Sequence, residues 1–240
     1  MTVRLLSAIA LIALLCSPAL AQQRTQYVLA ISWQPAFCET RPDRTECETQ
    51  TAKRFDASNF ALHGLWPQPR SRAYCGVDAD LLQLDENGDW DLLPEPDISS
   101  DLHDELQVLM PGAASGLDRH EWITHGTCYD GDAEAYFGDS LDLLDAINES
   151  AVRQLFATSI GKRLNQRQVR AAFDTAFGRG AGDRVRLSCV NDGNRRLINE
   201  LTIGLTGRPE GPDSFGDLIM AARPTDGGCD GGVVDAVGLQ

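Results

Sequence analysis

Apolar positions along the chain fall into short runs typical of strands and longer periodic stretches typical of helices. Tyr27–Trp33 is rich in Val, Ile and aromatic residues between turn formers, which predicts a buried strand. The alternating apolar run Asn59–His63 predicts a second strand. Val185–Val190 and Leu197–Leu205 predict two more, joined by a turn around Asp192–Asn194.

Between these strand pairs the apolar residues recur at helical spacing. Ser100 is the expected cap of the first helix, and Asn165 and Gly178 bound the last one. The predicted helices cover Asp101–Met110, Ala133–Phe137, Ser140–Ala157 and Gln166–Phe177. Strands and helices thus occupy separate runs, which predicts an α+β fold with a central, largely antiparallel sheet flanked by helices.

Three polar segments give no periodic signal. Pro35–Gln50 contains two cysteines and is expected to be a disulfide-bonded loop, and Pro67–Tyr74 is expected to be a basic loop. Asp78–Pro96 is acidic, with a turn expected at Asn87–Gly88, and it suggests no function.

The first residues have the pattern of a secretory signal peptide. Arg4 precedes the apolar run Leu5–Leu15, and small residues precede an expected cleavage after Ala21. The run is shorter than the roughly 20 residues of a membrane span. We therefore expect a signal peptide over residues 1–21 and a single domain over 22–240. This domain should work in the periplasm or outside the cell, without stable membrane association.

Cysteine usage agrees with export. An even number of cysteines remains after the expected cleavage, which predicts three disulfides, although the sequence alone leaves their pairing open. A zinc site is not favoured, because no Cys-x-x-Cys pair occurs. The six residues are Cys38, Cys47, Cys75, Cys128, Cys189 and Cys229.

Candidate chemistry is concentrated in the segment from residue 120 to 128. On a helix, His120 and Thr124 lie one turn apart, and so do Glu121 and His125, so these polar side chains share a face. A further histidine, His63, is expected at the end of the second strand, before a turn. Two imidazoles brought to one cleft by separate elements can transfer protons in both directions.

The segments His63-Gly-Leu-Trp-Pro67 and His120-Glu-Trp-Ile-Thr-His-Gly-Thr-Cys128 resemble the two signatures of the ribonuclease T2 family. The first matches throughout, and the second departs once, at Thr124, where the family usually has lysine. Weaker resemblance extends over Ser32–Pro35, Ser115–Leu117, Gln168–Arg170 and Leu197–Glu200, and so spans nearly all of the expected mature chain.

The resemblance implies an endoribonuclease that needs no metal or other cofactor and makes 2′,3′-cyclic phosphate ends. It implies that His125 is the base on the 2′-hydroxyl, that His63 is the acid on the leaving oxygen, and that His120 and Glu121 stabilise the phosphate. RNA is then the partner, DNA is not, and a monomer is expected. The resemblance also implies the disulfides Cys75–Cys128 and Cys189–Cys229, which leaves Cys38 for Cys47.

Substrate binding is expected to involve three residues of the motifs and the loop between them. Trp66 is either a stacking platform for a base or a core residue, and Tyr74 is a second candidate platform. Thr124 offers a hydroxyl where lysine would offer a cation, and losing such a donor costs on the order of 3 kcal/mol. We expect a slower enzyme or recruitment of a cation such as Arg119, and restoring lysine at 124 is expected to raise the rate.

Charge and spacing bear on the alternatives. The net charge of −14 argues against lasting association with a polyanion, although Lys53, Arg54, Arg70, Arg72 and Arg119 flank the motifs. A zinc hydrolase is excluded, because His120 and His125 point about 140° apart on a helix. A catalytically impaired RNA-binding or inhibitory protein is the remaining alternative, because Thr124 replaces the lysine that the family usually has.

Overall fold

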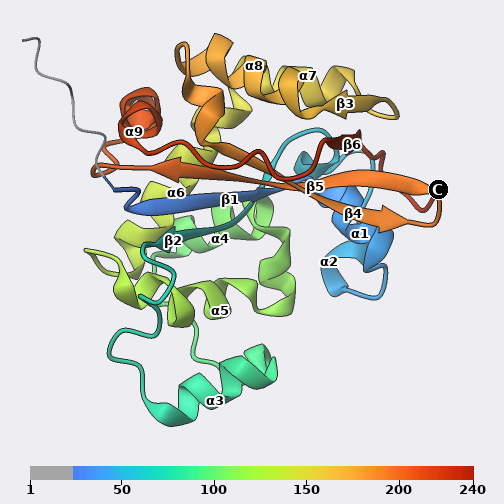
Figure 1. Ribbon diagram of the computed structural model, residues 1–240. Coiled ribbons are helices and arrows are strands. Elements are labelled where there is room, and N and C mark those ends of the chain that lie inside the picture. The colour runs from blue at the N-terminus through green and yellow to red at the C-terminus, as the bar shows by residue number, and fades with distance from the viewer. Residues whose placement is uncertain (1–23) are drawn as a thin grey trace, which may run out of the picture.

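A six-stranded mixed sheet runs through the centre of the computed structural model, which describes residues 24–240 (Figure 1). The strand order is β2-β1-β5-β6-β3, and β4 also pairs with β5. Every pairing is antiparallel except that of β5 with β6, so the predicted α+β class is confirmed. The predicted signal peptide lies outside the described residues. The strands are β1 Tyr27–Ser32, β2 Ala61–Pro67, β3 Arg163–Asn165, β4 Val185–Asp192, β5 Arg195–Leu205 and β6 Gly231–Val233.

Helices pack on both sides of this sheet. In the view of Figure 1, α7 and α8 lie above it, and α3 and α5 lie below. The described helices are α1 Gln34–Thr40, α2 Thr45–Glu48, α3 Ala79–Asn87, α4 Ser100–Leu109, α5 Leu117–Thr124, α6 Ala133–Asn148, α7 Ala151–Thr158, α8 Gln166–Phe177 and α9 Phe215–Ala221. None of them is long and apolar enough to cross a membrane.

Strand β1 does not alternate strictly between polar and apolar residues, because both of its faces are buried. Leu29, Ala30 and Ile31 are all fully buried, because β1 lies between β2 and β5 and both faces of the sheet are covered. Beyond its end, Trp33 packs against Phe60 and Phe156, with ring centroids 5.4 and 5.3 Å away. This aromatic cluster fixes the start of α1 against the base of β2.

The prediction that His63 lies at the end of the second strand is wrong. It does not end the strand, because β2 continues to Pro67. The pairing of β1 with β2 slips at this point: Ala30 faces Gly64 and Ile31 faces Leu62, so His63 is the extra residue of a β-bulge. The bulge directs the imidazole away from the sheet while the apolar residues on either side remain in the core.

Other boundaries differ from the predictions for local reasons. The expected loop Pro35–Gln50 contains α1 and α2, since a proline is compatible with the first turn of a helix. The acidic segment contains α3, which ends at Gly88 in the left-handed conformation, with φ of 80°. Helix α6 continues through the predicted break, and Ser150 instead caps α7. The short strands β3 and β6 and helix α9 were not predicted.

The cysteines form three disulfides, and these are the three pairings stated above. Cys38–Cys47 joins α1 to α2, and Cys189–Cys229 joins β4 to the segment before β6. Cys75–Cys128 links residues 53 apart and ties the loop after β2 to the end of α5. Both histidine motifs are therefore held together covalently.

Candidate active site

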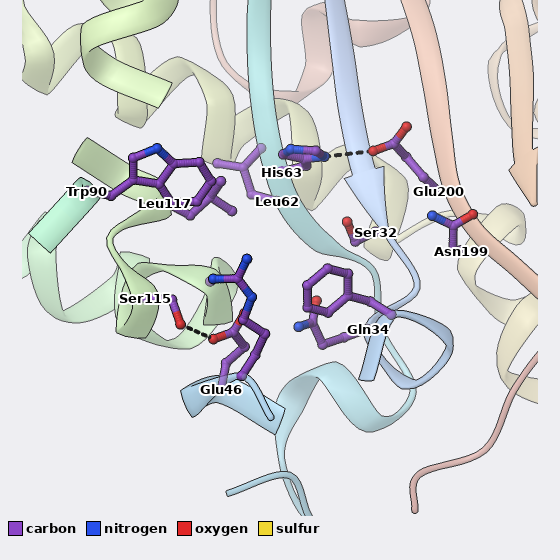
Figure 2. Close-up of a pocket in the computed structure, with 13 residues that line it drawn as sticks. Ser32, Gln34, Glu46, Leu62, His63, Trp90, Ser115, Leu117, Asn199 and Glu200 are labelled. Carbon is purple, nitrogen blue, oxygen red and sulfur yellow. Dashed lines mark hydrogen bonds and ion pairs between the residues drawn. The ribbon is translucent and has the colours of Figure 1, made fainter. Parts of the chain in front are cut away.

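His63 is held by a carboxylate from the middle of the sheet. Its Nδ1–H donates to Glu200 Oε2 of β5 at 2.7 Å (Figure 2). Burial would lower the pKa of His63, but the hydrogen bond to Glu200 and the charges of Glu121 and Glu200 outweigh it, so the pKa is raised. Because Nδ1 is occupied, Nε2 is the nitrogen left to exchange a proton with a ligand.

Glu121 lies behind His63 and is almost completely buried, with 1% of its surface exposed. Trp66 Nε1–H donates to its Oε2 at 3.0 Å, and Oε1 lies 3.6 Å from Nε2 of His63. Burial raises the pKa of Glu121, and the charges of His63 and His120 act against this rise. Gly64 makes the approach possible, since a Cβ there would lie 1.9 Å from Oε2.

His125 follows the last residue of α5, so it leaves the helical path and faces Trp66, with ring centroids 5.6 Å apart. The ring centroid of Trp66 is also 5.3 Å from that of His63. Burial, followed by the charges of His120 and His63, lowers the pKa of His125 to about 4. The buried Nδ1 of His125 has no hydrogen-bond partner among the described residues.

His120 occupies a separate part of the site, with its ring centroid 6.4 Å from that of His125. Its Nδ1 lies 2.7 Å from Oδ1 of Asp85, a buried residue of α3. The other carboxylate oxygen, Oδ2, accepts hydrogen bonds from the hydroxyls of Thr124 and Tyr74, each at 2.8 Å. Trp90 stacks on the imidazole at 4.3 Å between centroids.

The structure thus brings most of the predicted site residues together. Trp66 is only partly buried, and its ring lies near those of both His63 and His125, so it lies in the site rather than in the core. Tyr74 and Thr124 both direct their hydroxyls to Asp85. Arg119 is held by Glu95 at 2.7 Å and by two backbone carbonyls. Its guanidinium is therefore already paired, contrary to the expectation that it supplies the cation missing at residue 124.

Two carboxylates of the site had no role in the sequence predictions. Glu200 was noted only as part of a matching strand, and Asp85 lies in the segment for which no function was suggested. Neither has a local signal, because each meets its histidine only through tertiary packing: Glu200 is 137 residues from His63, and Asp85 is 35 from His120.

A cavity of about 240 Å³ opens beside His63. Figure 2 shows residues of β1, β2, β5 and the segments before α5 around it. Its walls combine apolar side chains with amides and hydroxyls, which suits a flat heterocycle with polar edges. The labelled lining residues are Ser32, Gln34, Glu46, Leu62, His63, Trp90, Ser115, Leu117, Asn199 and Glu200. No cluster of three potential metal ligands occurs within residues 24–240.

Comparison with known proteins places these residues in context. The ribonuclease T2 family profile matches residues 24–214, most of the chain and all of the site. The chain belongs to the ribonuclease T2 family. As a member of it, the protein is a T2-type endoribonuclease. It is 34% identical to ribonuclease I of Escherichia coli over 227 residues, which cover 83% of this chain and 84% of that protein. It is also 26% identical to ribonuclease T2 of Danio rerio, over 75% of this chain and 68% of that one.

Solved structures of the ribonuclease T2 family share the fold. RNase NT in complex with 5′-AMP superposes with a TM-score of 0.55 at 19% identity, covering 88% of this chain and 98% of that one. The self-incompatibility-associated SF11-RNase of Nicotiana alata gives 0.54 at 18% identity, covering 86% and 95%. The shared architecture therefore extends well beyond the two motifs.

Proposed function

We propose that the protein cleaves single-stranded RNA without a metal ion, by attack of a 2′-hydroxyl on its own phosphodiester. The products are a 2′,3′-cyclic phosphate and a free 5′-hydroxyl. The observation that carries the proposal is the pair of histidines next to Trp66, His63 and His125, whose pKa values are shifted in opposite directions. Two titratable groups with separated pKa values are suited to act as acid and base.

His125 is the base. A pKa of about 4 leaves its imidazole neutral at neutral and mildly acidic pH, so it can accept the proton of the 2′-hydroxyl. Its buried Nδ1, which has no partner in the described part of the chain, makes no competing hydrogen bond.

His63 is the acid. Its raised pKa keeps it protonated over a wider pH range, and the Glu200 carboxylate fixes Nδ1–H so that Nε2–H faces the leaving 5′-oxygen. Transfer of this proton breaks the P–O bond while the 2′-oxygen completes the ring. Glu121, 3.6 Å from Nε2, stabilises the positive charge before the transfer.

His120 and Glu121 complete the site around the phosphate. The Nε2 side of His120 is directed away from Asp85 and can donate to a phosphate oxygen as negative charge accumulates there. The cavity beside His63 takes the nucleotide that carries the leaving oxygen, and the partly exposed ring of Trp66 contacts the nucleotide that carries the attacking hydroxyl.

Export of the protein is part of the proposal. Three disulfides persist in an oxidising compartment, so the enzyme is suited to the periplasm or the exterior of the cell. RNA that reaches that compartment is then its substrate, and a monomer suffices, because every site residue named above comes from one chain.

The test is cleavage of matched RNA and DNA oligonucleotides in excess EDTA, with product ends identified by mass spectrometry. We expect cleavage of RNA only, to 2′,3′-cyclic ends, and its loss in His63→Ala and His125→Ala. His103→Ala is the matched control, because this histidine of α4 is 49% exposed and has no part in the proposed mechanism. A metal requirement, or cleavage of DNA, contradicts the proposal. RNA binding without any cleavage by the wild type supports the alternative of an impaired binding or inhibitory protein.

A further inference from the structure

Asp85 is a buried carboxylate whose one ion-pair partner in the described chain is a histidine. Its side chain is 1% exposed, and the pair with His120 has Nδ1 and Oδ1 at 2.7 Å. The hydroxyls of Thr124 and Tyr74 occupy Oδ2. A buried carboxylate is destabilising unless hydrogen bonds and an opposite charge compensate it. The hydrogen bonds come from all three neighbours, but a positive charge can come only from His120.

His120 is fixed on two sides by this arrangement. The carboxylate occupies Nδ1, and the indole of Trp90 stacks on the ring at an interplanar angle of 19°. An aromatic face attracts a cation that lies over it, so Trp90 also favours the charged form of the imidazole. Nε2 makes no hydrogen bond to a described residue, which leaves it free for an anionic ligand.

We infer that Asp85 is a positioning residue: together with Thr124 it holds His120 as an imidazolium aimed at the scissile phosphate, in place of the cation that a lysine at 124 would supply. The inference rests on the proposed function and deepens it. Thr124 has a structural role of its own. It is buried, and its hydroxyl donates a hydrogen bond to Asp85.

The identity of residue 124 and the presence of Asp85 are therefore linked. Residue 124 lies one helical turn after His120, and the two side chains converge on the same carboxylate. An ammonium group at 124 would meet Asp85 and neutralise it, and His120 would lose its partner. A lysine here is thus expected to slow the enzyme, contrary to the expectation from the motif alone.

Other ionisable groups around His120 do not replace Asp85. The carboxylate of Glu121 points to Trp66 and His63, and the positive charge of His120 helps to keep the pKa of His125 low. The other ionisable groups near the His120–Asp85 pair are Glu121 of α5, His125 after α5 and Tyr74 of the loop after β2, while Arg119 of α5 is paired with Glu95.

The first experiment compares Asp85→Asn with the wild type and with Asp80→Asn, an exposed control in the same helix. Asparagine keeps the shape and one acceptor oxygen but removes the charge. We expect kcat to fall about 10- to 100-fold with little change in KM, the size of the loss seen when the carboxylate partner of a metal-binding histidine is removed. Nitrogen-15 NMR of the active wild type should show both ring nitrogens of His120 protonated, with the charge lost in Asp85→Asn.

The second experiment is a double-mutant cycle with Thr124→Lys. We expect this change to lower kcat in the wild type but to raise it in the Asp85→Asn background, where the ammonium is no longer neutralised. Thr124→Val, which removes one hydroxyl without adding charge, keeps the inference testable if Asp85→Asn folds poorly. Its kcat should fall below that of the wild type, with little change in KM.

Three results would overturn the inference while leaving the proposed function intact. These are a folded Asp85→Asn enzyme with wild-type kcat, a neutral His120 in the active wild type, and additive effects in the cycle. Loss of the proposed function has a different signature, since the wild type itself would then fail to produce 2′,3′-cyclic ends.

Discussion

Glu200→Gln removes the charge that holds His63 while keeping the shape of the side chain and one acceptor oxygen. The alkaline limb of the pH–rate profile reports deprotonation of the acid, so activity is lost as the pH rises through the pKa of His63. Hydrogen bonding to Glu200 helps to raise that pKa. The substitution should therefore move the alkaline limb to lower pH.

The size of this shift follows from the geometry. A hydrogen bond to a charged group contributes about 1.5–3 kcal/mol, and one pKa unit corresponds to about 1.4 kcal/mol. Glu121 remains 3.6 Å from Nε2, and the His63 side chain is 32% exposed, so solvent screens part of the effect. We expect the limb to move by about 1 pH unit, at the low end of this range.

The assay measures initial rates on a dinucleoside phosphate from acidic to mildly alkaline pH. The acid limb is an internal reference: it reports the pKa of about 4 at His125, and activity is lost as the pH falls through it. Glu210→Gln, an exposed change of equal charge, is the control. An unchanged alkaline limb in a folded Glu200→Gln enzyme would refute the role of Glu200 in setting the acid.

Three further outcomes test how the site is built. Gly64→Ala should abolish most activity and destabilise the fold by about 1–3 kcal/mol in urea unfolding, because its Cβ would overlap the buried carboxylate. Gly138→Ala, with open space around it, should be neutral or stabilising, and equal behaviour of the two variants would contradict the argument. Replacing Cys75 and Cys128 together by serine should cost about 4 kcal/mol of unfolding free energy, and an unchanged urea midpoint would count against this. Trp66→Phe keeps an aromatic ring but removes the indole donor, so kcat should fall more than KM rises in steady-state kinetics, whereas a change in KM alone would point to base stacking only.

The sequence predicted those parts of the site that lie within contiguous motifs. His120, Glu121 and His125 share six residues, so their proximity follows from helical geometry, and His63 is marked by its own motif. The class of fold was also predictable, because strands and helices occupy separate runs.

The remaining features depend on tertiary structure. Glu200 reaches His63 across β1, so its role depends on strand order and register, which local patterns do not determine. Asp85 lies in an acidic helix with little separation of polar and apolar faces, so the sequence predicted no helix there. Its role follows only from the contact of α3 with His120 of α5. The expected use of Arg119 failed for the same reason, since closeness in sequence to His120 did not reveal its pairing with Glu95.

The bulge at His63 has a counterpart on β5. The pairing of β4 with β5 slips between Ser188 and Cys189, so that Asn199 is the extra residue there, next to Glu200. Both Asn199 and His63 line the cavity. Each is an insertion into a ladder that is regular before and after it, so the apolar register that stabilises the sheet is independent of which side chains occupy the two inserted positions. Asn199, which has no role in the proton transfers, can thus vary in sequence, and with it the ligands accepted, without any change in the packing of the core.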